Sequence, residues 1–294
     1  MTEAHDVLAE RFEEQRPRLR AMAYRMLGSL AEADDAVQEA WLRLARAEAG
    51  EVANLGGWLT TVVARVCLDT LRTRRTRREE PFGVSLPDPV VGREDAVNPE
   101  QEALLADAVG LALLVVLDTL TPAERLAFVL HDMFGVPFAE IGALVGRSPA
   151  AATQLASRAR RRVRGARVTS DVDRARHREL VTAFQVAARD GDLDGLLAVL
   201  DPDVVLRADP GAAAGGLAEA HGAQVVAERV STFASQAPFG RPALVNGLPG
   251  VVVIRAGVSP AAVLSFAVHG GRIVEIDVLA DPDRLRHLDL TGLA

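Results

Sequence analysis

The feature that most constrains the fold is a stretch in the middle of the chain, PFAEIGALVGRSPAAATQLASRARRRVR, which spans residues 137–164. Its pattern predicts a short helix over Phe138–Val145, a turn at Gly146-Arg147, and a second helix over Ala150–Arg164 that is capped by Ser148-Pro149. Two short helices joined by a glycine-containing turn, the second of them cationic, indicate a helix-turn-helix. The alternative is an amphipathic helix of a bundle with an arginine-rich solvent face.

The second predicted helix carries side chains suited to duplex DNA. Its Ser148 cap would aim free backbone N–H groups at a phosphate, and the small residues Ala150 to Ala152 would let the backbone approach a groove. Polar side chains then face the base edges, while the arginines at its end, Arg160 and Arg164 among them, suit the phosphate backbone. We therefore predict a DNA-reading surface formed by Arg147, Ser148, Ala151, Thr153, Gln154, Ser157, Arg158, Arg161 and Arg162.

Charge is distributed unevenly along the chain. The net charge of -7 argues against a protein that coats nucleic acid indiscriminately, and all 33 basic residues are arginine. Five arginines lie in Arg72–Arg78, and seven lie in Arg147–Arg167 with no acidic residue among them. Arginine makes forked contacts with phosphate and guanine. Because such runs are also common as solvated helix faces, the surrounding motifs decide what they mean.

The remaining composition excludes several classes of protein. Cys67 is the single cysteine, so no internal disulfide framework forms and a reducing, cytosolic setting fits. The N-terminus lacks the pattern of a signal peptide, and the most apolar run, Ala108–Leu117, is too short to span a bilayer and predicts a buried helix. The six histidines lack metal-ligand spacing and no glycine-rich phosphate loop is present, so we expect neither a metal nor a cofactor.

The first block, about Phe12 to Arg78, predicts three helices. An apolar stripe from Leu19 to Leu27 marks the first, and Gly28-Ser29 ends it. Ser29 followed by Glu32 forms a capping-box pattern at the start of the second helix. That helix turns Ala33, Val37, Ala40, Trp41 and Leu44 inward and leaves its acidic side chains on other faces. A third helix starts near Trp58 and ends in the first arginine tract.

The C-terminal block differs in kind. It predicts helices over Arg174–Arg189 and Gly222–Phe233, and strands over Val204–Ala208, Ala243–Arg255, Ala261–Val268 and Arg272–Leu279. Before it, Glu79–Glu100 contains four prolines and two glycines and predicts an extended linker rather than a packed element. We therefore expect a multidomain protein with a helical bundle over residues 1–78, a linker over 79–100, an all-α helix-turn-helix domain over 101–167, and an α+β domain over 173–294.

The order of these parts resembles a known family. The segments YRMLGSLAEADDAVQEAWLRL and NLGGWLTTVVARVCLDTLRTRR resemble region 2 of sigma-70 factors, and the helix-turn-helix resembles region 4. With regions 1 and 3 missing, the layout is similar to the extracytoplasmic function (ECF) group over residues 8–167. The resemblance implies an alternative sigma factor of the cytoplasm, not an enzyme, that binds core RNA polymerase through the clamp of its largest subunit. Regions 2 and 4 would then contact the −10 and −35 elements of promoter DNA.

The resemblance assigns roles to particular residues. It implies that polymerase binds Asp34, Asp35, Gln38, Glu39 and Leu42, and that the −10 element contacts Trp58, Arg65, Asp69, Arg72 and Arg75. The alternatives are that the acidic residues only solvate their helix and that Asp69 pairs with Arg65 one turn away. Family members often carry arginine where this chain has Thr153, so the −35 preference is not transferred.

The last block resembles the SnoaL-like, ketosteroid-isomerase-type cone, and a compact sigma factor that carries one is similar to the SigJ-type subgroup. SLPDP (85–89) stands where that subgroup has WLPEP, RADPGAAAGG (207–216) retains an aspartate and a glycine, and ADPDRL (280–285) is close to NPDKL. The resemblance implies an intramolecular contact with the sigma domains and a regulatory set of Asp209, Gly211, Asp281, Pro282, Asp283, Arg284 and Leu285.

Two alternatives stay open for the cone. One is catalysis, for which Asp209, His221 and Asp277 are the candidate residues, and the other is ligand sensing. A helix-turn-helix regulator with a ligand-sensing cone would bind an operator without polymerase, whereas a cone enzyme with a DNA-binding region would turn over a small hydrophobic substrate.

Overall fold

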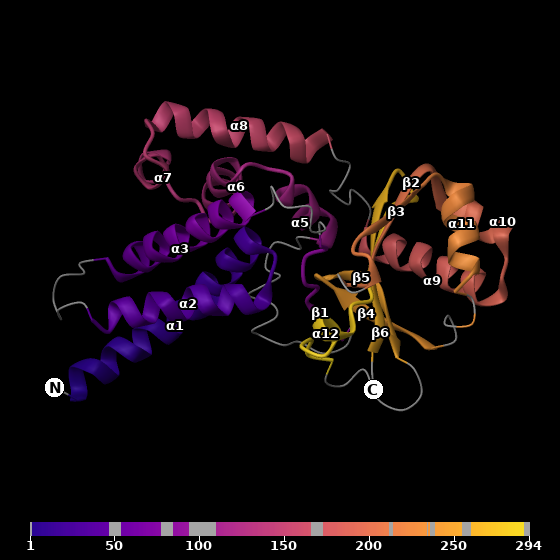
Figure 1. Ribbon diagram of the computed structural model, residues 1–294, viewed down its shortest axis with the longest axis horizontal. Helices are drawn as coiled ribbons and strands as arrows, with labels where there is room; N and C mark the ends of the chain where they lie inside the picture. Colours follow the sequence, from indigo (N-terminus) through magenta and orange to yellow (C-terminus); the bar gives the residue numbers. More distant parts are fainter. Residues whose placement is uncertain are drawn as a thin grey trace. The chain divides into compact units, whose positions relative to one another are not determined.

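The computed structural model describes residues 2–46, 54–77, 85–93, 110–165, 173–211, 214–233, 235, 239–254 and 260–290. The chain forms two compact units (Figure 1). The helical unit comprises Met1–Glu80, Pro99–Asp107 and Leu117–Arg162, and the sheet unit comprises Pro81–Asn98, Ala108–Val116 and Val163–Ala294. The predicted fold class, two all-α parts followed by an α+β domain, is confirmed. None of the described helices is long and apolar enough to cross a membrane.

The helical unit begins with α1 (Thr2–Leu27), α2 (Leu30–Leu44) and α3 (Leu55–Arg77). Their apolar stripes face one another, and the predicted stripe of α1 is buried. Trp41, predicted to point inward, is only partly buried and packs on Phe12 with ring centroids 5.0 Å apart. Ser29 accepts a hydrogen bond from the Glu32 amide and so caps α2, while the Glu32 carboxylate forms an ion pair with Arg74 of α3. This pair ties α2 to α3.

The predicted helix-turn-helix is present. After α5 (Leu111–Asp118) come α6 (Pro122–Phe128), a π-helical turn η1 (Val129–Met133), α7 (Phe138–Val145) and α8 (Pro149–Gly165). Gly146 ends α7 with φ of 66°, in the left-handed region that favours glycine. A Cβ at Gly142 would lie 2.7 Å from the Arg147 carbonyl oxygen, so the tight turn into α8 requires a glycine there.

A buried arginine joins the helix-turn-helix to the first helices of the same unit. Arg125 of α6 donates from Nε to the Arg25 carbonyl oxygen of α1 at 3.2 Å and from Nη1 to Asp118 at 2.6 Å. The Arg25 guanidinium lies 5.1 Å from the centre of the Phe134 ring. These contacts join the two all-α parts inside one compact unit.

Over the described residues, the sheet unit is built on a seven-stranded sheet in the order β1-β4-β5-β6-β7-β2-β3, and the β2–β7 pair is the parallel one. The strands are β1 (Val91–Gly92), β2 (Leu200–Asp209), β3 (Ala218–His221), β4 (Gly240–Val245), β5 (Leu248–Ile254), β6 (Pro260–His269) and β7 (Arg272–Leu279). The helices are α9 (Arg174–Asp190), α10 (Leu193–Val199), α11 (Ala223–Ser231) and the short α12 (Pro282–Leu285). One apolar core lies between α9, α10, α11 and the inner face of the sheet.

Two predictions were wrong in detail, one for a strand of the C-terminal block and one for the linker. The expected single strand over Ala243–Arg255 is a hairpin, because Asn246 and Gly247 both adopt positive φ and reverse the chain between β4 and β5. The linker was expected to be unpacked, yet Leu86, Val90 and Val91 are buried and β1 pairs with β4 as an edge strand. This part of the linker therefore belongs to the sheet unit.

Candidate functional site

The outer face of α8 carries the predicted DNA-reading side chains. Ser148 accepts a hydrogen bond from the Ala151 amide at 3.3 Å and caps the helix, as expected. Ala152, predicted to approach a groove, is buried and packs inward. The prediction that Ala152 faces a groove is wrong, because Ala152 lies on the apolar face of α8 with Leu155, Ala156, Ala159 and Val163. The polar members of the predicted set are exposed or partly exposed: Arg147, Ser148, Thr153, Gln154, Ser157, Arg158, Arg161 and Arg162.

One buried carboxylate organises the arginines of α8. Glu124 of α6 closes a full capping box with Thr121 and also accepts from Arg158 Nε at 2.8 Å and Arg162 Nη1 at 2.7 Å. Burial alone would raise the pKa of Glu124, but the hydrogen bonds from Arg158 and Thr121 and the charge of Arg162 outweigh it and lower the pKa to about 2. The sequence showed the capping box but not these two partners, which lie 34 and 38 residues away.

The arginines on the outer face of α8 therefore differ in how available their side chains are for DNA. Arg160, expected on the phosphate backbone, makes a forked pair with Asp132 at 2.6 and 3.0 Å. Arg158 and Arg162 remain about half exposed while they hold Glu124. Among the described residues, Arg147 and Arg161 have no side-chain partner, so they are the members of this set most available to a phosphate.

The outer face of α3 presents the second predicted set. Arg65, Asp69, Arg72 and Arg75 are exposed, and Trp58 is partly buried at the start of the helix. Asp69 lies 3.5 Å from Arg72 rather than pairing with Arg65, which removes the alternative reading of the Arg65–Asp69 spacing. The two arginine tracts meet within the helical unit, because a hollow of about 600 Å³ is lined by Arg72, Arg75, Arg147 and Arg158 together with Glu124.

The predicted polymerase-binding residues share the exposed side of α2. Asp35 and Gln38 are exposed, and Leu42 stands among them with 40% of its surface exposed. Asp34 accepts from Arg20 at 2.5 and 3.1 Å, and Glu39 accepts from Arg43 at 2.8 Å. Leu42 is therefore the apolar member of an otherwise polar set on this side of α2.

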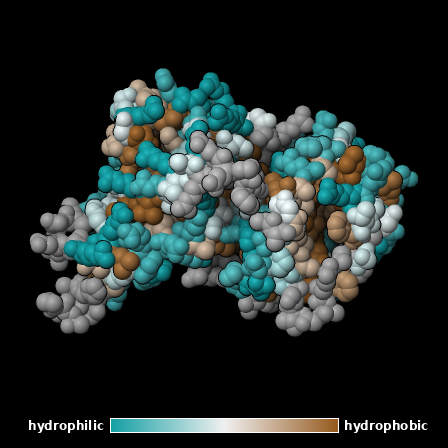
Figure 2. All heavy atoms as spheres, viewed as in Figure 1, coloured by the Kyte–Doolittle hydropathy of each residue, from teal (hydrophilic) through white to brown (hydrophobic). Residues whose placement is uncertain are grey.

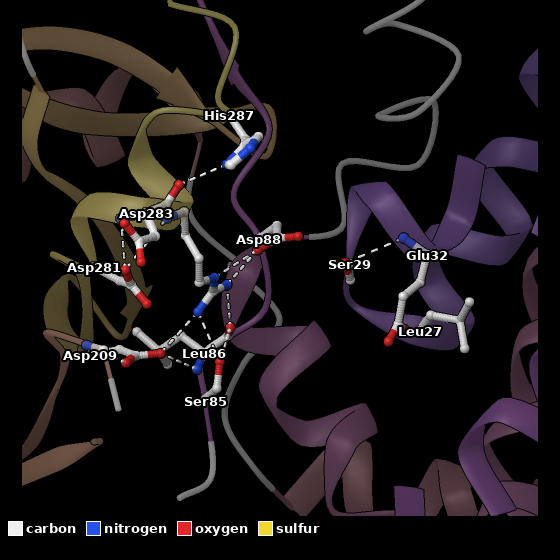
Figure 3. Close-up of polar contacts among 12 residues, drawn as sticks. Leu27, Ser29, Glu32, Ser85, Leu86, Asp88, Asp209, Asp281, Asp283 and His287 are labelled. Atoms are coloured by element: carbon white, nitrogen blue, oxygen red, sulfur yellow. Dashed lines mark hydrogen bonds and ion pairs between the residues drawn. The ribbon is translucent and has the colours of Figure 1, made fainter. Parts of the chain in front are cut away.

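In the sheet unit, the three short motifs flagged in the sequence meet at one arginine (Figure 3). Arg284 of α12 binds Asp88 at 2.5 and 2.9 Å, Asp209 at 2.9 Å, the Ser85 hydroxyl at 2.8 Å and the Leu86 carbonyl oxygen at 2.6 Å. Asp209 also accepts from the Leu86 amide at 2.9 Å. We call this set, Ser85, Leu86, Asp88, Asp209 and Arg284, the linker clasp.

Further residues hold the linker clasp in place. Asp281 caps α12 by accepting from the amides of Asp283 and Arg284. A Cβ at Gly211 would lie 2.7 Å from the Asp281 carboxylate, and the Gly211 amide donates to Asp209 at 3.1 Å. Asn246 exchanges hydrogen bonds with Val90, at 3.0 Å through its side chain and 2.8 Å through its backbone. The sequence patterns did not identify Asp88 and Asn246 as functional residues. The signals that could have found them are the Asp-Pro of the SLPDP segment and the Asn-Gly turn.

The residues considered for catalysis do not assemble a site. Asp209 is part of the linker clasp, His221 is exposed beside Glu219, and Asp277 is buried beside Arg207 at 3.2 Å. Burial and the neighbouring Glu275 raise the pKa of Asp277 to about 7. The described residues contain no group of three or more histidine, cysteine or carboxylate side chains placed to hold a metal.

Comparison with known proteins agrees with this layout. The family described as Sigma-70 region 2 matches residues 11–77, and that described as Sigma-70, region 4 matches residues 110–163. The probable ECF RNA polymerase sigma factor SigI of Mycobacterium tuberculosis is 37% identical over 288 residues, which cover 96% of each chain. The ECF RNA polymerase sigma factor SigJ of the same species is 40% identical and covers 93% of this chain and 91% of its own. The crystal structure of that SigJ matches 96% of this chain and 100% of its own with a TM-score of 0.78 and 35% identity.

Proposed function

We propose a role for each module of this chain, which belongs to the extracytoplasmic function (ECF) family of RNA polymerase sigma factors. As a sigma factor it binds core RNA polymerase and directs promoter-specific initiation of transcription, and it is not an enzyme. Its site of action is the cytoplasm, where the polymerase transcribes. Residues 1–78 act as region 2 on the polymerase clamp and the −10 element, and residues 101–167 act as region 4 on the −35 element. The α+β domain over residues 173–294 tunes the activity of both.

The linker clasp is the observation that supports control of transcription by the C-terminal domain. Residues 79–100 join the two promoter-reading regions, and the C-terminal domain holds residues 85–92 through Arg284 and the β1–β4 pair. A tethered domain meets its partner at a high effective concentration, so no separate protein is needed to occupy the linker. Arg284→Met, which opens the clasp without changing either promoter-reading surface, should therefore change run-off transcription by the whole chain.

The polymerase contact can be tested at Leu42. A hot-spot side chain at the centre of a polar-rimmed interface carries about 2 kcal/mol or more of the binding energy, and we place Leu42 at that position. Leu42→Arg should therefore weaken binding to core polymerase at least about tenfold in a fluorescence-anisotropy titration. The control is Val225→Arg, which alters another exposed apolar residue, on α11. Equal affinity of Leu42→Arg and the native chain would place the polymerase contact elsewhere.

Promoter reading by α8 can be tested at two exposed side chains. Gln154→Ala should lose about tenfold in binding to a cognate −35 duplex and little on a scrambled duplex, because an amide reads base edges. Arg161→Ala should weaken binding to both duplexes similarly and reduce the slope of log affinity against log salt by about 1, because it contacts phosphate. If Gln154→Ala weakened both duplexes equally, Gln154 would not read sequence.

A further inference from the structure

The C-terminal domain contains a large hydrophobic cavity. It has a volume of about 820 Å³ and lies between α9, α11 and the inner face of the sheet, where its walls include Phe184, Leu206, Val230, Val251, Leu264 and Ile276. Figure 2 shows hydrophobic surface between the sheet and the helices of this domain, bordered by hydrophilic side chains. Small-molecule sites are typically apolar hollows of roughly 300 to 1,000 Å³ with a few polar groups, so this cavity has the size and character of a ligand site.

The polar groups of the cavity indicate the chemistry of its ligand. Of the described residues that line it, Arg229 is the one with a charged side chain, and Gln185 is the one other with a polar side chain. The Arg229 guanidinium makes no hydrogen bond or ion pair with a described residue, although most arginines of the domain are paired. Phe233, 60% exposed, adds an aromatic surface at the same wall. A matching ligand has an apolar, drug-sized body and one anionic group.

The cavity and the linker clasp share two segments of the chain. At the end of β2, Ala208 and Pro210 line the cavity while Asp209 between them binds Arg284 and the linker. After β7, Ala280, Pro282 and Leu285 line the cavity, whereas Arg284 in the same segment belongs to the linker clasp and Asp281 caps its helix. A ligand that moves either segment therefore acts on residues bonded to the clasp.

We propose that this cavity binds a small, mainly apolar molecule with one anionic group and that its occupancy changes how firmly the C-terminal domain holds the linker. A ligand shifts such an equilibrium only by its difference in affinity for the two states. The same coupling must then appear in both directions, from cavity to clasp and from clasp to cavity. The effect on transcription rests on the proposed control by the C-terminal domain, whereas binding in the cavity does not.

Binding can be tested with the whole chain and 8-anilino-1-naphthalenesulfonate, an apolar fluorescent probe with one sulfonate. The native chain should bind it saturably, Arg229→Met should weaken it about threefold to fivefold, and the uncharged N-phenyl-1-naphthylamine should be unaffected by that substitution. Ala262→Phe, which fills the cavity, should weaken both probes about tenfold. Val225→Phe places the same aromatic ring at an exposed position outside the cavity and should leave both affinities unchanged. Equal effects of Ala262→Phe and Val225→Phe, or no saturable binding, would overturn the proposal.

Coupling can be tested by amide hydrogen exchange at Leu86 and Val90, whose amides bond to Asp209 and Asn246. Saturating probe should change their exchange rates severalfold, and Arg284→Met should in turn change probe affinity by a similar factor. Unchanged exchange with the cavity occupied would overturn the coupling. If Arg284→Met altered transcription in that case, the control by the C-terminal domain would stand without the ligand, so the two failures are distinguishable.

Discussion

Arg284→Met should lower the free energy of unfolding of the C-terminal domain by about 3 kcal/mol. The substitution removes the guanidinium that binds Asp88, Asp209, Ser85 and Leu86, and it leaves the buried Asp209 carboxylate without its cation. Breaking a buried ion pair on one side typically costs about 3 to 5 kcal/mol, and the lower value applies because the Gly211 amide still donates to Asp209. Amide hydrogen exchange of β6 and β7 measures the loss directly.

The matched control is Arg286→Met, two residues further along the chain. Arg286 is exposed and, of the described residues, its side chain pairs with Asp283 alone, so its removal should change the stability by less than about 0.5 kcal/mol. The Leu86 and Val90 amides should exchange faster in Arg284→Met and at the native rate in Arg286→Met. Identical behaviour of the two variants would show that Arg284 does not hold the linker.

Glu124→Gln should destabilise the helical unit by about 3 kcal/mol at neutral pH. The amide keeps the shape of the capping box but removes the charge that Arg158 and Arg162 share, on a side chain that is only 5% exposed. Amide hydrogen exchange of α6 and α8 reports the stability of this unit separately from that of the sheet unit, which has helices of its own. The exposed Glu39, paired with Arg43, provides the matched control, because Glu39→Gln should cost less than about 0.5 kcal/mol.

The pH dependence of this effect has a definite sign. The pKa of Glu124 is lowered from 4.5 to about 2 in the folded chain, so its charge stabilises the fold fully above pH 4.5. That contribution is lost as the pH falls from 4.5 toward 2, because the unfolded chain takes up the proton first. The difference between the native chain and Glu124→Gln should therefore shrink over this range. A difference independent of pH would show that the arginines do not stabilise the carboxylate.

Local patterns predicted the elements whose signals lie within a few residues. The Thr121 capping box, the helix-turn-helix around Gly146 and the hairpin at Gly270-Gly271 are all present. Ala152 was misplaced because three consecutive alanines do not show which one faces the core. The β4–β5 hairpin was read as one strand because apolar residues on both sides obscured the Asn246-Gly247 turn.

Contacts between distant segments could not be predicted in this way. Arg284 and Asp88 lie 196 residues apart, and no periodicity in either segment indicates the other. The family resemblance selected Asp209, Gly211 and residues 281–285, and the structure places them together. It also singled out the SLPDP segment of the linker but did not show which C-terminal residues that segment contacts. The composition of the linker predicted an extended chain, and the described backbone of the linker is extended. Leu86 and Val90 are nevertheless buried, because this segment covers an edge and an apolar face of the sheet.

The most direct test of control through the linker clasp is run-off transcription with core polymerase and one cognate promoter. Three full-length chains are compared at equal concentration: the native chain, Arg284→Met and Arg286→Met. We expect Arg284→Met to differ from the native chain severalfold in transcript yield, and Arg286→Met to match it. If all three chains gave equal yields although hydrogen exchange showed that Arg284→Met releases the linker amides, control of transcription through the linker clasp would be contradicted.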